Sequence, residues 1–310
     1  MSEPLDPIDD LLDVLDLEHQ GPTQVRVTAL GGEHEDLSVS AGDAFVGRSQ
    51  PQPSGRVFGG QVLAQCVMAA GRTVVDDGDG PRRIHSLHGY FLRPGDANRP
   101  IRFLVERMRD GASFSARRVH AVQEGRILMS MSTSFQEAAD GLDHHTPMPA
   151  VPPAESLESD AAMLSRHEHP AARFLAERRA VDLRHVEPVL YAEPDPDRSS
   201  TQHLWLKVPR ELPEDPLLHA AVLAYASDYS LLEPVMRHHG VVWQDRRLRM
   251  ASLDHAMWFH RQPKLDDWVL YAQDTPSAQG GRGLGRGLMF AADGTLVATV
   301  AQEGMIRLKE

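Results

Sequence analysis

The chain has 310 residues, of which 41% are hydrophobic and 25% are charged. This is the composition of a globular protein, so it excludes wholesale disorder and a fibrous repeat, and the length predicts about two domains. The net charge of −12 argues against a protein that binds nucleic acid through its overall electrostatic field.

The cysteine content and the sequences near the two chain ends help to predict the cellular compartment of the protein. Cys66 is the single cysteine, which excludes an intramolecular disulfide and a zinc site built from cysteines. The acidic N-terminal segment lacks the layout of a signal peptide, no apolar stretch is long enough for a membrane span, and the final RLKE is not a peroxisomal or endoplasmic-reticulum signal. We therefore expect a soluble, cytoplasmic protein.

The first half of the chain is predicted to contain two helices and a series of strands. Residues 5–17 alternate apolar residues and aspartates with a helical period, and 24–40 is strand-like around a Gly-Gly turn. In 58–74, apolar residues recur at three- and four-residue spacing, which predicts a mostly buried helix. Strand-like runs separated by glycine turn signals then predict an antiparallel meander over 84–94, 101–110, 113–123 and 126–136.

A segment of different composition follows. Residues 141–180 are rich in Pro, Ala and acidic residues and lack an apolar period, so we interpret them as a linker with a short helix at 171–180. The linker divides the chain into an N-terminal domain, 1–140, and a C-terminal domain, 181–310.

The C-terminal half repeats the plan of the first half. A helix is predicted over 216–236, with strand-like runs at 181–191, 202–208, 248–261, 267–275, 283–290 and 295–308. Short identities, such as VLAQ at 62–65 and VLAY at 222–225, support a duplication. We expect an α+β fold in which each half packs one long helix across a highly twisted antiparallel sheet, because both elements must bury an apolar face.

Several catalytic motifs are absent. The chain has no G-x-S-x-G, S-x-x-K, H-E-x-x-H or G-x-x-x-x-G-K-[ST] motif, which disfavours α/β serine hydrolases, zincins and P-loop NTPases. GGRGLGRG at 280–287 is similar to a phosphate-binding loop, but it departs from G-x-G-x-x-G spacing and a strand follows it. We favour a glycine-bearing strand that another backbone or a ligand approaches closely.

The histidines and the cysteine do not combine into an evident site. His144 and His145, like His167 and His169, lie in the linker without a third ligand at helical or strand spacing, so solvated side chains are favoured over a metal site. Cys66 falls on the apolar stripe of its helix, where a free cysteine is usually a core residue, and a nucleophilic role would need a nearby histidine.

Asp228 interrupts an apolar stripe on the second predicted helix. A carboxylate in such a stripe is costly unless it is paired or hydrogen-bonded, so Asp228 is a functional candidate, while a structural acid bonded to neighbouring hydroxyl groups is an equal alternative. The stripe consists of Ala221, Ala224, Tyr225, Asp228, Leu232 and Val235. When VLAY is aligned with VLAQ, Met68 falls opposite Asp228. We therefore expect one active site per chain, in the C-terminal half.

Two later segments carry polar residues among apolar ones. Gln302 lies near the end of an apolar run, where it could hold water or a carbonyl, or satisfy the backbone at a strand end. In ASLDHAMWFHR, strand alternation predicts two faces, one with Ser252, Asp254, Ala256 and Trp258 and the other with Leu253, His255 and Met257.

These motifs match a known family. RVFGGQVLAQ, HSLHGYFLRPGD, YASDYSLLEP, ASLDHAMWFHR and VATVAQEGMIR together resemble the acyl-CoA thioesterase II family, the double-hotdog thioesterases, over residues 20–308. The resemblance implies two fused hotdog domains, each a long central helix wrapped by a twisted antiparallel sheet. It also implies hydrolysis of acyl-CoA, for which we expect medium- or long-chain fatty acyl groups, to free fatty acid and coenzyme A, with no metal, cofactor or covalent intermediate.

Carried over by motif, the resemblance implies a catalytic set of Asp228, Ser252 and Gln302, with Ser252 at a position where Thr also occurs in the family. Asp228 would accept a proton from a water molecule that Ser252 and Gln302 hold in line with the thioester carbonyl carbon. Backbone N–H groups near the N-terminal half of the helix would stabilise the oxyanion.

Other expectations concern the substrate. Candidate substrate-binding residues are Gly59, Gly60, His88, Arg282 and Arg286, although the two arginines could equally be solvated surface. An acyl channel would have a wall of flexible methionines, or the same residues would be plain core: Met129, Met131 and Met257.

Two alternative functions stay open. A hotdog enoyl-CoA hydratase or dehydratase would need an Asp/His pair on one loop-helix segment, and no histidine lies within four residues of Asp228. A non-catalytic acyl-CoA-binding protein is disfavoured because all three polar positions are present. We expect acyl-CoA as the ligand, a homo-oligomer of double-hotdog chains, no nucleic-acid partner and no membrane span.

Overall fold

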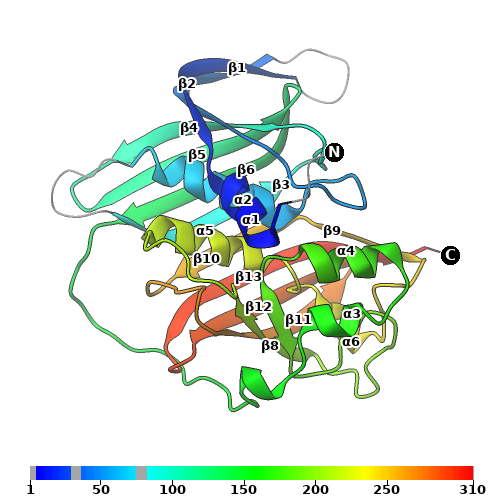
Figure 1. Ribbon diagram of the computed structural model, residues 1–310. Coiled ribbons are helices and arrows are strands. Elements are labelled where there is room, and N and C mark those ends of the chain that lie inside the picture. The colour runs from blue at the N-terminus through cyan, green and yellow to red at the C-terminus, as the bar shows by residue number, and fades with distance from the viewer. Residues whose placement is uncertain (1–4, 29–35, 75–81, 310) are drawn as a thin grey trace. The chain divides into compact units, whose positions relative to one another are not determined.

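The computed structural model describes residues 5–28, 36–74 and 82–309. The chain divides into two compact units (Figure 1): the N-terminal unit, Leu11–Leu142 with Asp215–Tyr225, and the C-terminal unit, Met1–Asp10 with Asp143–Glu214 and Ala226–Glu310. A helical segment from the second half of the sequence therefore belongs to the unit built mainly from the first half. Within the described ranges, no helix is both long and apolar enough to cross a membrane.

The N-terminal unit contains an antiparallel sheet with strand order β1-β2-β4-β5-β6-β3. The strands are β1 (Glu18–Thr28), β2 (Asp36–Gly47), β3 (Arg83–Phe91), β4 (Ile101–Asp110), β5 (Phe114–Gln123) and β6 (Arg126–Gln136), and the helices are α1 (Pro7–Leu15), which enters this unit at Leu11, and α2 (Gly59–Gly71). The predicted strands are confirmed from 84 to 136, but β3 pairs with β6, so only β4, β5 and β6 form a meander. The connection from β3 to β4 is too long for a tight hairpin turn. The predicted Gly-Gly turn at 31–32 lies outside the described residues.

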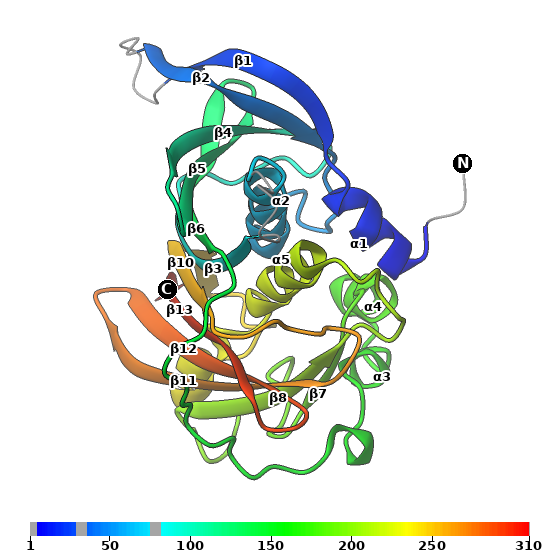
Figure 2. The same cartoon turned by 90° about the vertical axis from the view of Figure 1, so that its left-hand side faces the viewer.

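Helix α2 confirms the helix predicted over 58–74, and strands β4, β5 and β6 curve around it (Figure 2). All its residues from Gly60 to Ala70 are buried, because the sheet covers one side and residues of the second long helix, among them Leu217 and Tyr225, pack against another. Gly60 makes that packing close: a Cβ atom there would lie 2.3 Å from the carbonyl oxygen of Tyr225. A side chain at this position would push the two helices apart.

Within the C-terminal unit, neighbouring strands are antiparallel and follow the order β10-β13-β12-β11-β8-β7, with β9 paired with β13. Its strands are β7 (Asp182–His185), β8 (Thr201–Lys207), β9 (Leu248–Ser252), β10 (Asp254–Phe259), β11 (Val269–Gln279), β12 (Arg282–Ala291) and β13 (Leu296–Leu308). Its helical segments are the 3₁₀ turn Ala154–Ser156, α3 (Asp160–Leu164), α4 (Pro170–Arg178), the end of α5 (Pro216–Ser227), and α6 (Glu233–His238).

Three predicted elements are shorter or broken. The helix predicted over 216–236 is wrong as one element: α5 ends at Ser227 and α6 begins at Glu233. Pro234 prevents one continuous helix, since it has no N–H to bond the carbonyl oxygen of Ser230 and its ring clashes there; it lies instead in the first turn of α6, where proline is tolerated. The strand predicted over 181–191 ends at His185, shortly before Pro188, and the strand predicted over 248–261 is interrupted at Leu253.

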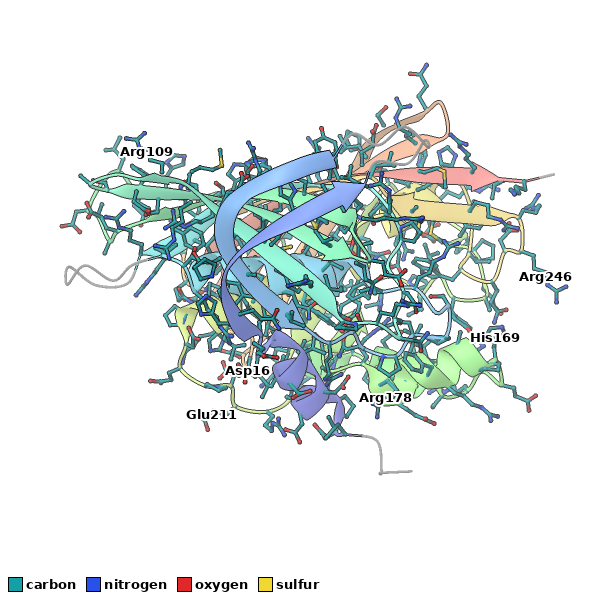
Figure 3. All side chains as sticks on the ribbon, turned by 90° about the horizontal axis from the view of Figure 1, so that it is seen from above. Asp16, Arg109, His169, Arg178, Glu211 and Arg246 are labelled. Atoms are coloured by element: carbon teal, nitrogen blue, oxygen red, sulfur yellow. The ribbon has the colours of Figure 1, made fainter. Side chains whose placement is uncertain are left out.

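The segment predicted to be a linker is folded and contributes side chains to the core. The helix predicted at 171–180 is confirmed as α4, and Figure 3 shows His169 and Arg178 at its two ends. Ala154 packs in a buried cluster with Trp205, whose indole N–H donates to the carbonyl oxygen of Pro152 at 3.0 Å. Buried apolar side chains here exclude a purely solvated tether, and the lack of an apolar period reflects short helices rather than disorder.

Candidate active site

Asp228 lies immediately after the last residue of α5, in the turn that connects α5 to α6. The predicted position inside a helical apolar stripe is therefore wrong, because the helix ends one residue earlier. The turn is closed by backbone hydrogen bonds from Tyr229 to Ala226, at 3.2 Å, and from Glu233 to Ser230, at 2.8 Å. Asp228 is half-buried at this site, so part of the residue remains accessible to solvent.

Strand β12 gives this turn its support. A Cβ atom at Gly285 would lie 2.0 Å from the carbonyl oxygen of Leu231, and one at Gly283 would lie 2.7 Å from a methyl carbon of Val235. The expectation that the GGRGLGRG strand allows close approach is confirmed: the approaching group is the backbone of the Asp228 turn at Gly285 and the Val235 side chain of α6 at Gly283. Glycine at these positions lets the turn lie directly on the sheet.

The structure brings Asp228, Ser252 and Gln302 together from three different elements. The Nε2 atom of Gln302, on β13, donates to the Oγ atom of Ser252 at 2.7 Å. Ser252, the last residue of β9, in turn donates to Oδ1 of Asp228 at 3.4 Å. Gln302 is 2% exposed, whereas the other two side chains are half-buried. The resulting arrangement is a short chain of polar groups that ends on a carboxylate.

The interruption at Leu253 decides which side chains face the hydrogen-bonded series of Gln302, Ser252 and Asp228. The N–H group of Leu253 donates to the carbonyl oxygen of Glu303 at 2.9 Å, while the N–H group of Glu303 donates to a carboxylate oxygen of Asp254 at 2.8 Å. A break in the ladder changes the phase of alternation, and the predicted separation of Ser252 from His255 is wrong. Both side chains contact the amide of Gln302.

His255 is a site residue that sequence analysis did not assign. It is 1% exposed; its Nδ1 atom lies 2.5 Å from Oε1 of Gln302, and its Nε2 atom lies 3.0 Å from Oγ of Ser227. Burial lowers the pKa of His255 to about 4, against the opposing effect of the Gln302 hydrogen bond. The imidazole is therefore neutral at pH 7.

Tyr271 adds a second buried donor to the same region. Its hydroxyl group donates to the carbonyl oxygen of Ser227 at 3.1 Å, which satisfies one of the carbonyl groups that the end of α5 leaves without a helical partner. Burial, together with the negative charge of Asp228, raises the pKa of Tyr271 well above its ordinary value. Tyr271 therefore remains protonated and holds the end of α5 in position.

A buried polar network fixes the other side of the turn. Gln273 donates to the hydroxyl oxygen of Ser230 at 2.9 Å and accepts from Gln202 at 3.3 Å. Gln202 also donates to Glu233 at 2.6 Å and accepts from Arg237 at 2.8 Å. These side chains are all less than 10% exposed, so each bond is made away from water, and the turn is held at both ends.

The candidate substrate-binding residues have other contacts. Arg282 pairs with Glu303 at 3.0 Å and Arg286 with Asp274 at 2.6 Å; both arginines are about half-exposed. His88 is exposed on β3 of the N-terminal unit. Gly59 and Gly60, the first residues of α2, also belong to the N-terminal unit, where packing of the helices accounts for Gly60.

The candidate cysteine and methionines are core residues. Cys66 is fully buried in α2, and burial raises the pKa of its thiol, which opposes formation of a nucleophilic thiolate. Met129, Met131 and Met257 are each no more than 1% exposed. In the part of the chain that the structure describes, no group of three or more His, Cys, Asp or Glu side chains is arranged to hold a metal ion.

The comparisons with known proteins agree with the resemblance found in the sequence. The family model described as "Acyl-CoA thioesterase" matches residues 175–305, and the model described as "Acyl-CoA thioesterase N-terminal domain" matches residues 48–136. Acyl-coenzyme A thioesterase 8 of Homo sapiens is 37% identical over 279 residues, which cover 86% of this chain and 85% of the relative. The chain belongs to the acyl-CoA thioesterase family.

Other members of this family cover the chain to a similar extent. Acyl-CoA thioesterase 2 of Haemophilus influenzae is 35% identical over 270 residues, 86% of this chain and 93% of the relative. The crystal structure of acyl-CoA thioesterase II TesB2 from Mycobacterium marinum matches with a TM-score of 0.72 and 40% identity, covering 97% of this chain and 99% of that chain. A hot-dog-fold protein from Alicyclobacillus acidocaldarius also has a TM-score of 0.72, at 16% identity, and supports the hotdog fold alone.

Proposed function

We propose that this chain hydrolyses acyl-CoA thioesters at a site formed by Asp228, Ser252 and Gln302. The observation that carries the proposal is the hydrogen-bonded sequence from Gln302 through Ser252 to the carboxylate of Asp228, in a chain that belongs to the acyl-CoA thioesterase family. A carboxylate beside two neutral polar groups is suited to activate water without a metal.

In the proposed reaction, water is the nucleophile. Asp228 removes a proton from a water molecule positioned by the hydroxyl group of Ser252 and the amide of Gln302, and the water oxygen attacks the thioester carbonyl carbon. Backbone N–H groups stabilise the oxyanion of the tetrahedral intermediate. The intermediate then collapses to the fatty acid and expels the thiolate of coenzyme A. The thiolate takes up the proton that Asp228 removed from water.

The geometry disfavours the hydratase alternative. Such an enzyme would pair an acid with a histidine. His255 is hydrogen-bonded within the site, but its partners are Gln302 and Ser227. Its lowered pKa, caused by burial, makes it a poor proton donor at pH 7. Asp228 is therefore proposed to act on water rather than in an acid-base pair with histidine.

Further features belong to this proposal. We propose a double-hotdog chain with domains 1–140 and 181–310, joined through 141–180, in which Met68 occupies the position equivalent to Asp228. Met68 is buried within α2, whereas Asp228 follows the end of α5. We also propose medium- or long-chain fatty acyl-CoA as substrate, a cytoplasmic location and a homo-oligomer.

The CoA nucleotide is proposed to contact Arg282 and Arg286. These arginines would exchange carboxylate partners for phosphate groups, which is feasible because both ion pairs are exposed to solvent. Gly59, Gly60 and His88 remain proposed contacts for the rest of the substrate.

Release of free thiol from acyl-CoA tests the function directly. Purified protein should release thiol from medium- and long-chain acyl-CoA faster than from short-chain acyl-CoA, with EDTA present throughout. Activity that EDTA abolishes and zinc restores would overturn the metal-free mechanism. Absence of thiol release across the whole range of chain lengths would overturn the thioesterase assignment.

A further inference from the structure

Four hydrogen bonds join the site residues into one continuous path. The path runs from Ser227 to His255 at 3.0 Å and from His255 to Gln302 at 2.5 Å. It continues from Gln302 to Ser252 at 2.7 Å and ends at Asp228, 3.4 Å from the serine oxygen. Because Ser227 and Asp228 are neighbours in the chain, the path returns to its starting point.

The donor and acceptor in each hydrogen bond of this path can be assigned by starting from the Asp228 carboxylate. An ionised Asp228 can only accept, so Ser252 donates its single hydroxyl proton to it. The oxygen of Ser252 must then accept from Gln302, and an amide donates only through its NH₂ group. The carbonyl oxygen of Gln302 therefore faces His255.

The same reasoning fixes the histidine. Because the Gln302 oxygen is an acceptor, the Nδ1 atom of His255 must carry a proton. A neutral imidazole carries one proton, so Nε2 accepts, and the hydroxyl group of Ser227 is its donor. The pKa of His255, lowered to about 4 by burial, supports the neutral form.

We infer that His255 is a positioning residue: as the Nδ1–H tautomer it holds the amide of Gln302 with its NH₂ group on Ser252. This inference rests on the proposed function for its catalytic meaning. The reversed amide would present a carbonyl oxygen to Ser252 and draw the serine proton away from Asp228. The Ser252 hydroxyl group would then donate to Gln302 instead of to Asp228, and the groups that position water would be reversed as donors and acceptors.

The tautomer can be read in the resting enzyme without substrate. Protein labelled with ¹⁵N at its histidines is examined at pH 7 by long-range ¹H–¹⁵N correlation, and the His255 signals are identified by their loss in His255→Asn. The expected spectrum has a protonated Nδ1 and an unprotonated Nε2. A protonated Nε2, alone or in an imidazolium, would overturn the inference.

Two variants provide the kinetic counterpart. In His255→Asn the side-chain amide can place an N–H group near the position of Nδ1, whereas in His255→Gln the amide lies nearer the position of Nε2. We expect kcat to fall by about 10- to 100-fold in His255→Gln, with a much smaller change in KM, and to be partly restored in His255→Asn. Equal loss in both variants with unchanged stability would contradict a role through the Gln302 amide.

The two proposals fail in distinguishable ways. A protein with the expected tautomer that releases no thiol from any acyl-CoA would overturn the thioesterase function and leave the direction of the path intact. An active thioesterase with a protonated Nε2 would overturn only the role of His255.

Discussion

Ser227 and Asp228 are consecutive residues that occupy opposite ends of one hydrogen-bonded path. The hydroxyl group of Ser227 lies 3.0 Å from Nε2 of His255, and Oδ1 of Asp228 lies 3.4 Å from Oγ of Ser252. The end of α5 therefore holds both the first donor and the final acceptor of the site. A shift of this helix end would strain both ends of the path together, which couples the packing of α5 to the geometry of the carboxylate.

Asp228→Asn should abolish most of the turnover while the protein stays folded. The amide cannot take a proton from water, so we expect kcat to fall by about 10²- to 10⁴-fold. Thiol release measures the rate, and circular dichroism with thermal unfolding measures the fold. Near-native turnover in this variant would remove Asp228 from the proposed mechanism.

Met68→Ala is the matched control from the other half of the chain. Met68 is 4% exposed in α2, so its truncation leaves a cavity and should lower the free energy of unfolding by roughly 2–5 kcal/mol. Most of kcat should be kept. Denaturant unfolding gives the stability, and a large loss of kcat without destabilisation would contradict a purely structural Met68.

Gly285→Ala should impair the site more than Gly283→Ala. A Cβ atom at Gly285 would lie 2.0 Å from the backbone oxygen of Leu231, which cannot move without displacing the turn that carries Asp228. At Gly283 the nearest atom, at 2.7 Å, belongs to the side chain of Val235. We expect kcat in Gly285→Ala to fall by about tenfold or more.

The comparison of the two glycine variants must separate activity from stability. Both variants should lose stability, since each adds a methyl group to a tight contact. The ratio of kcat loss to the loss in free energy of unfolding should be larger for Gly285→Ala. Equal ratios would show that contact with the turn has no specific effect on the active site.

The sequence predicted those features that depend on local periodicity. The apolar spacing of 58–74 survives in the structure because no proline interrupts α2. The same criterion failed over 216–236, where the chain turns against β12 between Ser227 and Glu233, and Pro234 lies in the first turn of a new helix. Alternation failed between Ser252 and His255 because it could not anticipate the break at Leu253.

Only part of the site could be predicted from the sequence. Asp228, Ser252 and Gln302 were named because their motifs resemble a known family. His255 and Tyr271 were not assigned, since their roles depend on contacts with Gln302 and the Ser227 carbonyl across different elements. Such contacts have no periodic signal; the available clue was that His255 lies in the same motif as Ser252, three residues further along.

Protonation of His255 should make the protein less stable in acid. Its pKa is 6.5 in the unfolded reference and about 4 in the folded chain, so the unfolded state binds the extra proton between these values. The contribution of the neutral, buried imidazole is fully present above pH 6.5 and is lost as the pH falls toward about 4, by about 3 kcal/mol. Denaturant unfolding of the wild type and of His255→Asn across this range isolates the effect. Parallel stability curves for the two proteins would contradict it.

Ser252 should orient water rather than form an acyl-enzyme. A serine nucleophile needs a base to take its proton, as histidine does in a catalytic triad. The oxygen of Ser252 instead accepts from Gln302, and His255 lies on the far side of that amide. Asp228, to which Ser252 donates at 3.4 Å, is a carboxylate rather than the histidine base of a triad, and we expect it to take a proton from water.

The variants at this position distinguish the two mechanisms. Ser252→Thr keeps a hydroxyl group for orienting water and should retain most of the activity, whereas Ser252→Ala should lose about 10²-fold in kcat. A nucleophile would tolerate the added methyl group of threonine poorly. Intact-mass spectrometry during turnover should show no acyl adduct, and rapid mixing should show no burst of thiol release. An acyl group on the peptide that contains Ser252 would replace direct water attack with covalent catalysis, because the serine oxygen would then have displaced coenzyme A before water entered the reaction.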